Sequence, residues 1–450
     1  MVSVSGFRGR VGDPLTPELI AALAAGFGSF LRAEGSGDTV FLGRDSRTSG
    51  PMFEAAAAAG LASVGMDVVR LGIVPTPTLL MAGREAGAAG ALGVTASHNP
   101  AEWNALKFAG GDGTFLDGPR MERFQASLVA SDPLRTSWDT LGAIGEDHGA
   151  VDRHIDRILE LPLIDADRLR ARGFHVALDC VHGAGGLSAP RLLEALGCSV
   201  SAIGVEADGR FPRDPEPTAA NLGDLSALVR ESGAELGFAV DPDVDRLSLV
   251  DEGGRPLGED LTLALCAATV LKRESGPVVT NLSTSRVVED VAIHAGVDFS
   301  LAPVGEINVS RAMQAVGAVV GGEGNGGIIL PALHGTRDAM VGMALILQHL
   351  LDEEVTLSEA AGRWPEYRIV KEKSPFPRER LGEGYDALRR ELPAPRSDDS
   401  DGLRLDWPEE GRWVHVRPSG TEPVVRFIAE ARTERDAQDL VRRAQEVLGA

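Results

Sequence analysis

The sequence has few cysteines and no long apolar run. Its three cysteines, Cys180, Cys198 and Cys266, lack CxxC spacing, which argues against a disulfide framework and against a thiolate metal site. No run of 18 uncharged apolar residues occurs, and no charged, then apolar leader opens the chain. We therefore expect buried, reduced cysteines in a cytoplasmic protein.

Positive charge is also scarce. Lys and Arg number 44 against 66 Asp and Glu, which gives a formal net charge of −22. Nucleic acid and anionic membranes repel such a chain over long range, so we expect neither as a partner. A small anionic substrate can still bind where cations gather locally. At 450 residues the chain is too long for one core, and domain sizes favour roughly three or four domains.

A strand–helix–glycine–strand pattern recurs three times. The copies begin with apolar strands predicted at residues 39–42, 174–178 and 277–282, and the glycines that follow their helices are Gly65, Gly197 and Gly296. Glycine suits the left-handed cap that ends a helix. A helix between two short strands predicts a β-α-β unit with a parallel pair. We therefore expect three related α/β domains with mixed sheets.

Each copy then adds a third apolar stretch that ends in a polar loop. The stretches span residues 91–94, 236–240 and 317–320, and the key polar residues of the loops begin at Ser97, Asp241 and Glu323. Ligand sites in α/β sheets lie beyond the carboxyl ends of strands. Three equivalent loops are therefore expected to line one central cleft.

The pattern changes after Trp364. Residues 391–407 are rich in proline and aspartate and indicate a mobile turn region, followed by strands at 413–416 and 424–428 and a helix at 433–448. This order predicts a smaller α+β domain. The predicted domains are residues 1–145, 146–252, 253–365 and 366–450, with a linker at 132–150.

The first loop, TASHNP, contains Ser97. We expect Ser97 at an exposed strand end, where its hydroxyl can carry a phosphoryl group that faces backbone N–H groups and cations. An ordinary turn is the alternative, because Ser, Asn and Pro are common in turns. The three further polar loops favour the chemical interpretation.

The second loop alternates Asp241, Asp243 and Asp245. Three converging carboxylates suit a hard cation, and Mg²⁺ is the usual choice where a phosphate shares the site. An EF-hand is excluded because Arg246 stands where that loop requires glycine. A solvated acidic turn is the remaining alternative.

The third loop, residues 322–327, matches GxGxxG, but an apolar strand follows it instead of a helix. A dinucleotide site is therefore not expected. Glu323 and Asn325 instead offer an acceptor and an amide to vicinal sugar hydroxyls, with glycines that permit close approach. A carboxylate in a phosphate-rich cleft suits a ligand with an uncharged polar body, which points to a sugar phosphate.

The fourth loop, residues 417–423, combines backbone N–H groups and two hydroxyls with an arginine, a donor set that binds a phosphate dianion. A tight hairpin is the alternative. The candidate ligands are Arg417, Ser419, Gly420 and Thr421, with Arg426 if it points the same way.

Three further side chains are candidates for catalysis. Lys107 lies among apolar residues and near other cations, so we expect a lowered pKa and a role as proton carrier. Arg8 cannot deprotonate usefully and is assigned electrostatic stabilisation. His98 is either an acid/base partner or a support for the serine loop.

Together, TASHNP, DPDVDR and RPSGTEP, in this order and at this spacing over the whole chain, resemble the α-D-phosphohexomutase superfamily. The resemblance implies three related α/β domains and a fourth α+β domain around a central cleft. It also implies a set of site residues. These are phosphorylated Ser97, Mg²⁺ held by its phosphate with Asp241, Asp243 and Asp245, sugar contacts from Glu323 and Asn325, and phosphate binding by Arg417, Ser419, Gly420 and Thr421.

The implied reaction moves a phosphoryl group between the 1- and 6-positions of a hexose phosphate through a bisphosphorylated sugar, with a hexose bisphosphate as activator. Mg²⁺ and Arg246 would neutralise charge on the transferred group. Glucosamine phosphate is the favoured substrate and mannose or glucose phosphate the alternative, in a monomer or homodimer. A metal-dependent sugar phosphatase and a non-catalytic sugar-phosphate sensor are the competing classes.

Two motifs depart from the pattern of the superfamily. Many members end the sugar loop in Ser-Gly-His, whereas this chain has Asn325-Gly326-Gly327, so any role of that histidine is lost or moved. The opening motif keeps Arg8 but lacks the usual Gly-Thr pair.

Overall fold

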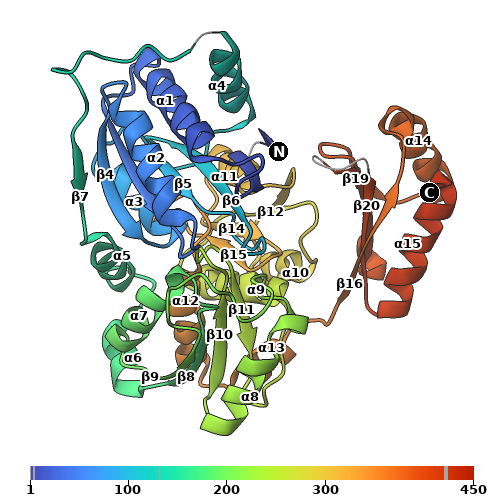
Figure 1. Ribbon diagram of the computed structural model, residues 1–450. Coiled ribbons are helices and arrows are strands. Elements are labelled where there is room, and N and C mark those ends of the chain that lie inside the picture. The colour runs from blue at the N-terminus through green and yellow to red at the C-terminus, as the bar shows by residue number, and fades with distance from the viewer. Residues whose placement is uncertain (1, 4–5, 131, 420–423, 450) are drawn as a thin grey trace.

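Four β-sheets follow one another along the chain (Figure 1). The computed structural model describes residues 2–3, 6–130, 132–419 and 424–449. We call the four sheets with their helices units I to IV. Three α/β units followed by an antiparallel α+β unit confirm the predicted fold class. The domain boundaries at 145, 252 and 366 stay a prediction.

Unit I contains a seven-stranded sheet in the order β1-β2-β6-β5-β3-β4-β7. Its strands are β1 (Val2–Ser3), β2 (Gly6–Arg10), β3 (Thr39–Arg44), β4 (Asp67–Ile73), β5 (Gly90–Val94), β6 (Trp103–Gly110) and β7 (Ile144–Glu146). Its helices are α1 (Pro17–Ala33), α2 (Gly50–Ala62), α3 (Thr76–Glu85) and α4 (Gly118–Ala130).

Units II and III each contain a four-stranded sheet. The elements of unit II are α5 (Ala150–Leu159), α6 (Ala166–Arg172), β8 (His175–Asp179), α7 (Ala189–Ala195), β9 (Ser199–Ile203), α8 (Gly223–Ser232), β10 (Leu236–Val240) and β11 (Leu247–Val250). Those of unit III are α9 (Glu259–Leu271), β12 (Val278–Asn281), α10 (Val287–Ala295), β13 (Phe299–Ala302), α11 (Glu306–Val316), β14 (Val320–Glu323), β15 (Gly327–Ile329), α12 (Ala339–Glu353) and α13 (Leu357–Gly362).

Unit IV contains a five-stranded antiparallel sheet in the order β16-β20-β19-β18-β17. Its elements are β16 (Arg368–Pro375), α14 (Leu381–Glu391), β17 (Arg396–Asp398), β18 (Leu403–Trp407), β19 (Arg412–Pro418), β20 (Val424–Ala431) and α15 (Glu434–Leu448).

Units I to III share one strand order. In each, the first strand of the repeat lies between the second and the third and is parallel to both, and a fourth, antiparallel strand lies beyond the third. These strands are β3, β4, β5 and β6 in unit I, β8 to β11 in unit II, and β12 to β15 in unit III. The predicted parallel pairs are confirmed, and the three polar loops are equivalent connections between the third and fourth strands.

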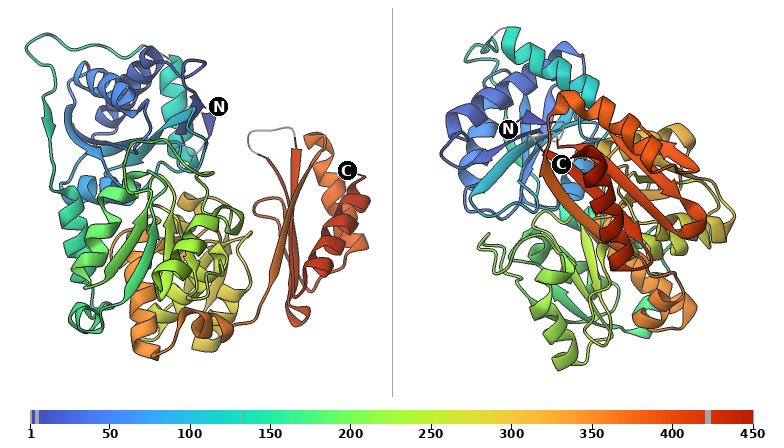
Figure 2. Two further views of the ribbon diagram at one scale, coloured as in Figure 1. Left: turned by 60° about the horizontal axis from the view of Figure 1, so that its bottom comes forward. Right: turned by 90° about the vertical axis from the view of Figure 1, so that its right-hand side faces the viewer.

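The first three units share a hydrophobic core, whereas unit IV has its own. The largest cluster of buried apolar side chains runs from Phe41 in unit I to Ala360 in unit III. A separate cluster, from Phe376 to Leu448, lies within unit IV. The right-hand view of Figure 2 shows unit IV in front of unit III. Polar contacts join these two units, for example between Ser283 and His415 at 2.9 Å.

Two predictions about irregular segments are wrong. The predicted linker at 132–150 contains β7, which pairs in parallel with β4, and its last residue begins α5. The predicted turn region at 391–407 contains β17 and β18. Leu403, Leu405 and Trp407 alternate along β18 and are buried, because this strand lies inside the sheet between β17 and β19. Proline and aspartate around it concealed the pattern. The sequence also gave no prediction of β16 or α14.

Among the described residues, no helix combines the length and the apolar character needed to cross a membrane. All three cysteines are buried as free thiols.

Candidate active site

A cavity of about 520 Å³ is lined by residues from all four units. The predicted site residues that line it are Arg8, Ser97, His98, Lys107, Arg246, Glu323, Asn325, Arg417 and Arg426. The carboxylates of Asp241, Asp243 and Asp245 are buried and contact Ser97, Lys107 and Arg337. Ser419 is buried, and Gly420 and Thr421 lie outside the described residues. The polar loops therefore converge as the repeat predicts.

Ser97 is buried, with 3% of its surface exposed, so the expectation of an exposed strand end is wrong. The residue follows β5 in a left-handed conformation with φ of 49°. Such a backbone is strained for a residue other than glycine and persists only where its surroundings hold it. The Ser97 hydroxyl donates a 2.7 Å hydrogen bond to Asp241 Oδ2. The nucleophile candidate of unit I thus faces the carboxylate loop of unit II.

Arg47 holds the serine loop in this conformation. Its side chain is fully buried between the end of β3 and the loop. The guanidinium donates to the carbonyl oxygens of Ser97, Asn99, Pro100 and Trp103 at 2.5 to 3.0 Å. It also donates to the Asp45 carboxylate at 2.9 Å, and Thr95 donates to the same oxygen. One side chain therefore satisfies most of the carbonyls that the turn would leave unpaired.

The three aspartates form a cluster that fits a metal ion. One carboxylate oxygen from each lies within 4.8 Å of the others. Thr76 and Lys107 donate to Asp243 Oδ2, whereas Arg337 donates to Asp245 Oδ2. The other oxygens, Asp243 Oδ1 and Asp245 Oδ1, are buried and have no hydrogen-bond partner among the described residues.

Burial of a carboxylate oxygen without a hydrogen-bond partner costs free energy. A cation bound between these oxygens would offset that cost. Burial, with repulsion from Asp245 and Asp243, raises the pKa of Asp241 well above its ordinary value. Oxygen ligands of this charge suit a hard divalent cation. The donor set of the second loop therefore fits the predicted metal.

Lys107 lies against this cluster on β6. Its Nζ atom is 2.7 Å from Asp243 Oδ2 and 3.9 Å from Asp245 Oδ2. Burial alone would lower the pKa of Lys107, but the two carboxylates outweigh burial and raise it. The expectation of a lowered pKa is therefore wrong for this structure, because the sequence did not show that the lysine pairs with Asp243. Lys107 is charged and neutralises part of the cluster.

His98 lies beside Ser97 among cations. Burial, and then repulsion from Arg246 and Arg8, lowers the pKa of His98 to about 2, so the imidazole is neutral at pH 7. Its Nδ1 atom is buried and has no hydrogen-bond partner within the described part of the chain. Arg8 donates to Asn99 Oδ1 in the same loop. A neutral ring next to two arginines is able to accept a proton only where an anion offsets their charge.

Glu323, at the end of β14, is held from three sides. Oε1 accepts from Asn281 Nδ2 at 2.8 Å and from the Gly305 N–H at 3.0 Å, and Oε2 accepts from Arg337 at 2.9 Å. Its orientation toward the cavity is thus fixed by the protein.

The glycines of this loop allow close approach to the protein itself. A Cβ atom on Gly326, whose φ is +81°, would lie 2.2 Å from the Leu247 carbonyl oxygen of unit II. The Leu247 N–H donates to the Gly326 carbonyl at 3.0 Å. The expectation that the glycines serve the ligand is therefore incomplete, because Gly326 is required where the second and third loops touch.

Unit IV adds two arginines to the cavity. Arg417 on β19 and Arg426 on β20 are directly opposite partners in the antiparallel pair, and both line the cavity. Like charges placed directly opposite on a sheet are destabilising. Asp401 compensates in part, 2.9 Å from the Arg417 guanidinium. The remaining positive charge makes this end of the cavity a site for an anion.

Comparison with known proteins matches each unit to a family. Residues 2–132, 152–254 and 258–367 match the phosphoglucomutase/phosphomannomutase alpha/beta/alpha domains I, II and III, and residues 387–447 match the C-terminal domain of the same proteins. The chain belongs to this phosphohexomutase family. It is therefore a mutase, an intramolecular phosphotransferase.

Relatives of this phosphohexomutase align over nearly their whole length. A probable phosphoglucosamine mutase of Methanopyrus kandleri is 36% identical, with 97% of this chain and 95% of the relative covered. A phosphoglucomutase/phosphomannomutase of Thermococcus kodakarensis is 34% identical, with 96% and 95% covered. The crystal structure of a phosphoglucomutase/phosphomannomutase family protein from Burkholderia thailandensis has a TM-score of 0.86 and 28% identity, with 100% and 98% covered.

Sequence reasoning missed several residues of the phosphohexomutase site. Asp45 and Arg47 lie three and five residues after the predicted strand at 39–42, so polar residues after a strand were a signal for them. Thr76 and Asn281 carried no such signal. Arg337 lies in a polar loop after β15, and its importance depends on contacts between units that no local pattern records.

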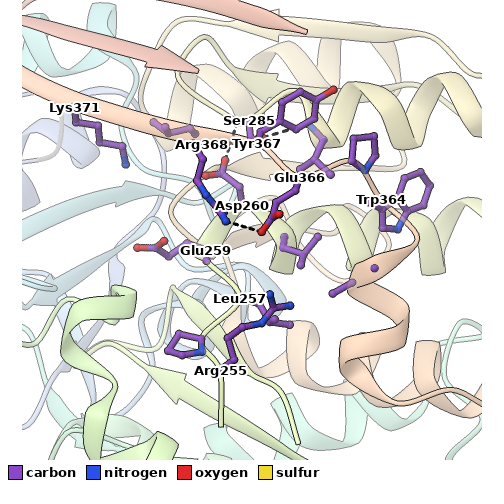
Figure 3. A pocket seen from close by; sticks show the side chains of 18 residues that line it. Arg255, Leu257, Glu259, Asp260, Ser285, Trp364, Glu366, Tyr367, Arg368 and Lys371 are labelled. Carbon is purple, nitrogen blue, oxygen red and sulfur yellow. Dashed lines mark hydrogen bonds and ion pairs between the residues drawn. The ribbon is translucent and has the colours of Figure 1, made fainter. Parts of the chain in front are cut away.

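A second cavity, of about 730 Å³, lies where the chain passes from unit III to unit IV. Figure 3 shows Arg368 beside Asp260 and directed at Glu366, to which it donates at 2.6 Å. Lys371 lines this cavity and also the active-site cavity. The connecting segment that follows Trp364 thus reaches from the junction of the two units to the phosphohexomutase cleft.

Proposed function

We propose that the protein interconverts the 1- and 6-phosphates of a hexose through a phosphorylated Ser97, with glucosamine phosphate as the substrate. The observation that carries this proposal is the 2.7 Å contact between the Ser97 hydroxyl and Asp241, within a carboxylate cluster that fits a divalent cation. A serine in that position is ready to hold a phosphoryl group next to a metal.

The residues of the cluster have separate tasks in this proposal. Asp241, Asp243 and Asp245, together with a phosphate oxygen on Ser97, would hold Mg²⁺. When bound, Mg²⁺ supplies charge neutralisation at the transferred phosphoryl group. Lys107 stays charged and orients Asp243.

Arg8 and Arg246 line the cavity around Ser97 and provide fixed positive charge for the phosphoryl oxygens. Phosphoryl transfer depends mostly on such positioning and electrostatics. His98 is neutral and adjoins the nucleophile, and it would take up a proton from the attacking sugar hydroxyl only once the phosphoryl anion on Ser97 offsets the charge of Arg8 and Arg246.

The opposite side of the cavity would hold the sugar and its second phosphate. Glu323 and Asn325 face the sugar hydroxyls, and the Arg417–Arg426 pair faces the phosphate that is not transferred. A bisphosphorylated sugar must turn over between the two half-reactions, so the two ends of the cavity must each accept either phosphate. A hexose bisphosphate would also restore phosphate to Ser97 and act as activator.

Glucosamine phosphate is preferred over mannose or glucose phosphate for two reasons. Glu216, Glu306 and Glu323 all line the cavity, and they offer acceptor oxygens to the ammonium group of an amino sugar in addition to the arginines that they contact. The Methanopyrus relative, 36% identical, also carries the name of a phosphoglucosamine mutase. Mannose and glucose phosphates remain the second candidates within the same reaction class. Cytoplasmic location and a monomeric or dimeric state remain predictions.

The test combines phosphate mapping with turnover. We expect mass spectrometry to find phosphate on Ser97, and we expect Ser97→Ala to lower isomer formation by at least about 1,000-fold, because the nucleophile is lost. Ser36→Ala, at an exposed loop serine, is the matched control and should keep full activity. Glucosamine 6-phosphate should be converted faster than mannose or glucose 6-phosphate. Release of inorganic phosphate without isomer, or full turnover by Ser97→Ala, would refute the proposal.

A further inference from the structure

Arg337 connects the second and third loops of the cleft. The residue is buried just before α12. Its guanidinium contacts three carboxylates: Nη2 lies 2.6 Å from Asp245 Oδ2, Nη1 lies 2.9 Å from Glu323 Oε2, and Nε lies 3.2 Å from Glu306 Oε2. Asp245 belongs to the metal cluster and Glu323 to the sugar loop. One planar group therefore bridges the two parts of the site.

Gly327 provides the space for this arginine. A Cβ atom on Gly327 would lie 2.2 Å from Cδ and 2.9 Å from Cγ of Arg337. Contacts under 3.0 Å with this part of the stem would force the side chain to move. The φ angle of Gly327 is not positive, so the backbone itself does not require glycine. Gly327 is thus explained by the path of Arg337.

We infer that Arg337 is a positioning residue that couples metal binding at Asp245 to sugar-phosphate binding at Glu323. This inference rests on the proposed function, because it concerns the same metal and sugar sites. Arg337 holds one oxygen of each carboxylate, which leaves Asp245 Oδ1 without a hydrogen-bond partner among the described residues and 3.7 Å from Arg246 Nε.

The coupling follows from how three carboxylates share one positive charge. Without a divalent cation, the carboxylates of Asp245, Glu306 and Glu323 share the positive charge of the Arg337 guanidinium. A cation at the aspartates neutralises Asp245, so that more of the Arg337 charge is available to Glu323 and to an anionic ligand in the cavity. Each ligand should then strengthen the binding of the other, because coupling between two sites is reciprocal.

Three variants separate this role from simple loss of a contact. Arg337→Met keeps an unbranched apolar stem and removes the charge. Arg337→Lys keeps the charge but not the fork that reaches several carboxylates. Gly327→Ala leaves every charged group in place and displaces the stem through the 2.2 Å contact. Gly223→Ala is the matched control, because a Cβ atom there meets nothing within 4 Å.

The measurement is calorimetric titration of dephosphorylated protein with glucosamine 6-phosphate, in Mg²⁺ and in EDTA. Without phosphate on Ser97 no turnover follows binding. In the unmodified protein and in Gly223→Ala, we expect Mg²⁺ to tighten sugar-phosphate binding at least about 5-fold, the lower end of typical coupling. In Arg337→Met and Gly327→Ala the ratio should fall to below about 2-fold, and Arg337→Lys should recover part of it.

Circular dichroism and the Mg²⁺ affinity measured without sugar check that each variant folds and keeps its metal site. Retention of the full ratio by Gly327→Ala and Arg337→Met would overturn the inference, as would a ratio of one in the unmodified protein. Failure of the proposed function has another result, namely absence of phosphate on Ser97 and of any isomer. A working mutase whose coupling survives loss of Arg337 refutes only the inference.

Discussion

Replacing Arg47 should lower turnover strongly, although Arg47 is not among the residues that line the cleft. Arg47→Ala removes one hydrogen bond to Asp45 and four to carbonyls of residues 97–103. Hydrogen bonds to a charged group contribute about 1.5 to 3 kcal/mol each, so five independent bonds would sum to about 7 to 15 kcal/mol. That sum is an upper bound, because Pro100 is exposed and a released loop would hydrate.

The loss from the fully buried partners sets the expected size. The hydrogen bonds of Arg47 to Asp45 and to the Ser97 carbonyl are buried, and removal of one partner from a buried ion pair costs about 3 to 5 kcal/mol. We expect this loss in the free energy of unfolding for Arg47→Ala. Ser97 would leave its φ of 49° and its contact with Asp241. A misplacement of about 1 Å can lower turnover about 100-fold.

Two measurements test this reasoning. Urea denaturation followed by tryptophan fluorescence, to which Trp103 at the end of the loop contributes with four other tryptophans, reports stability. Hydrogen exchange of residues 95–103 reports the loop itself, which matters because a protein with several units need not unfold in one step. Arg47→Lys is the matched variant: it keeps the charge next to Asp45 but cannot reach four carbonyls.

Arg47→Lys should therefore lose less stability than Arg47→Ala, while both lose loop protection and activity. Wild-type exchange rates and turnover in Arg47→Ala would refute the argument. An Arg47→Lys variant with wild-type exchange rates and turnover would also refute it. That result would mean that the positive charge alone holds the loop and that the guanidinium geometry is not required.

Two further predictions concern contacts between units. Burial raises the pKa of Glu430, at the junction of units III and IV, to about 7, so its contribution to stability is complete below about pH 4.5 and is lost as pH rises through 7. The protection of unit IV amides, after correction for the intrinsic pH dependence of hydrogen exchange, should therefore be lower at pH 8 than at pH 6. Glu430→Gln, which keeps an acceptor for Trp413, should reduce this difference in protection; an unchanged difference would contradict the prediction. His154 of unit II is buried and bonds Asp338 of unit III at 2.9 Å, so His154→Leu should lower the free energy of unfolding by about 2 to 3 kcal/mol. Urea denaturation checks this, and binding of Mg²⁺ and sugar phosphate should stay unchanged in the folded variant.

The sequence predicted the parts of the fold that depend on local pattern. The three parallel pairs followed from apolar strands, one helix each and a glycine after it, and all three are present. The strand β18 was missed because its alternating Leu403, Leu405 and Trp407 are embedded among prolines and aspartates. The pairing of β7 with β4 was missed because a three-residue, exposed strand has no apolar pattern to reveal it.

The candidate site divides in the same way. The convergence of the polar loops on one cavity was predicted because polar groups follow apolar strands in each repeat. The burial of Ser97 and the raised pKa of Lys107 were not predicted, because they depend on Arg47 and Asp243, which lie far away in sequence. The spacing of motifs in the sequence indicates which loops meet, but it does not indicate which carboxylate each lysine or arginine pairs with.

The repeat also explains why this site needs every unit at once. Equivalent connections between the third and fourth strands carry the proposed nucleophile in unit I, the proposed metal ligands in unit II and the proposed sugar-facing carboxylate in unit III, and each depends on a neighbour. Asp241 holds Ser97, Lys107 of unit I holds Asp243, and Arg337 of unit III holds Asp245. The second loop, with Asp241, Asp243 and Asp245, therefore keeps its carboxylates in these positions only when units I and III are packed against it. This dependence agrees with the core that units I to III share, which packs the loops of Ser97, Asp241 and Glu323 together, whereas unit IV has a core of its own.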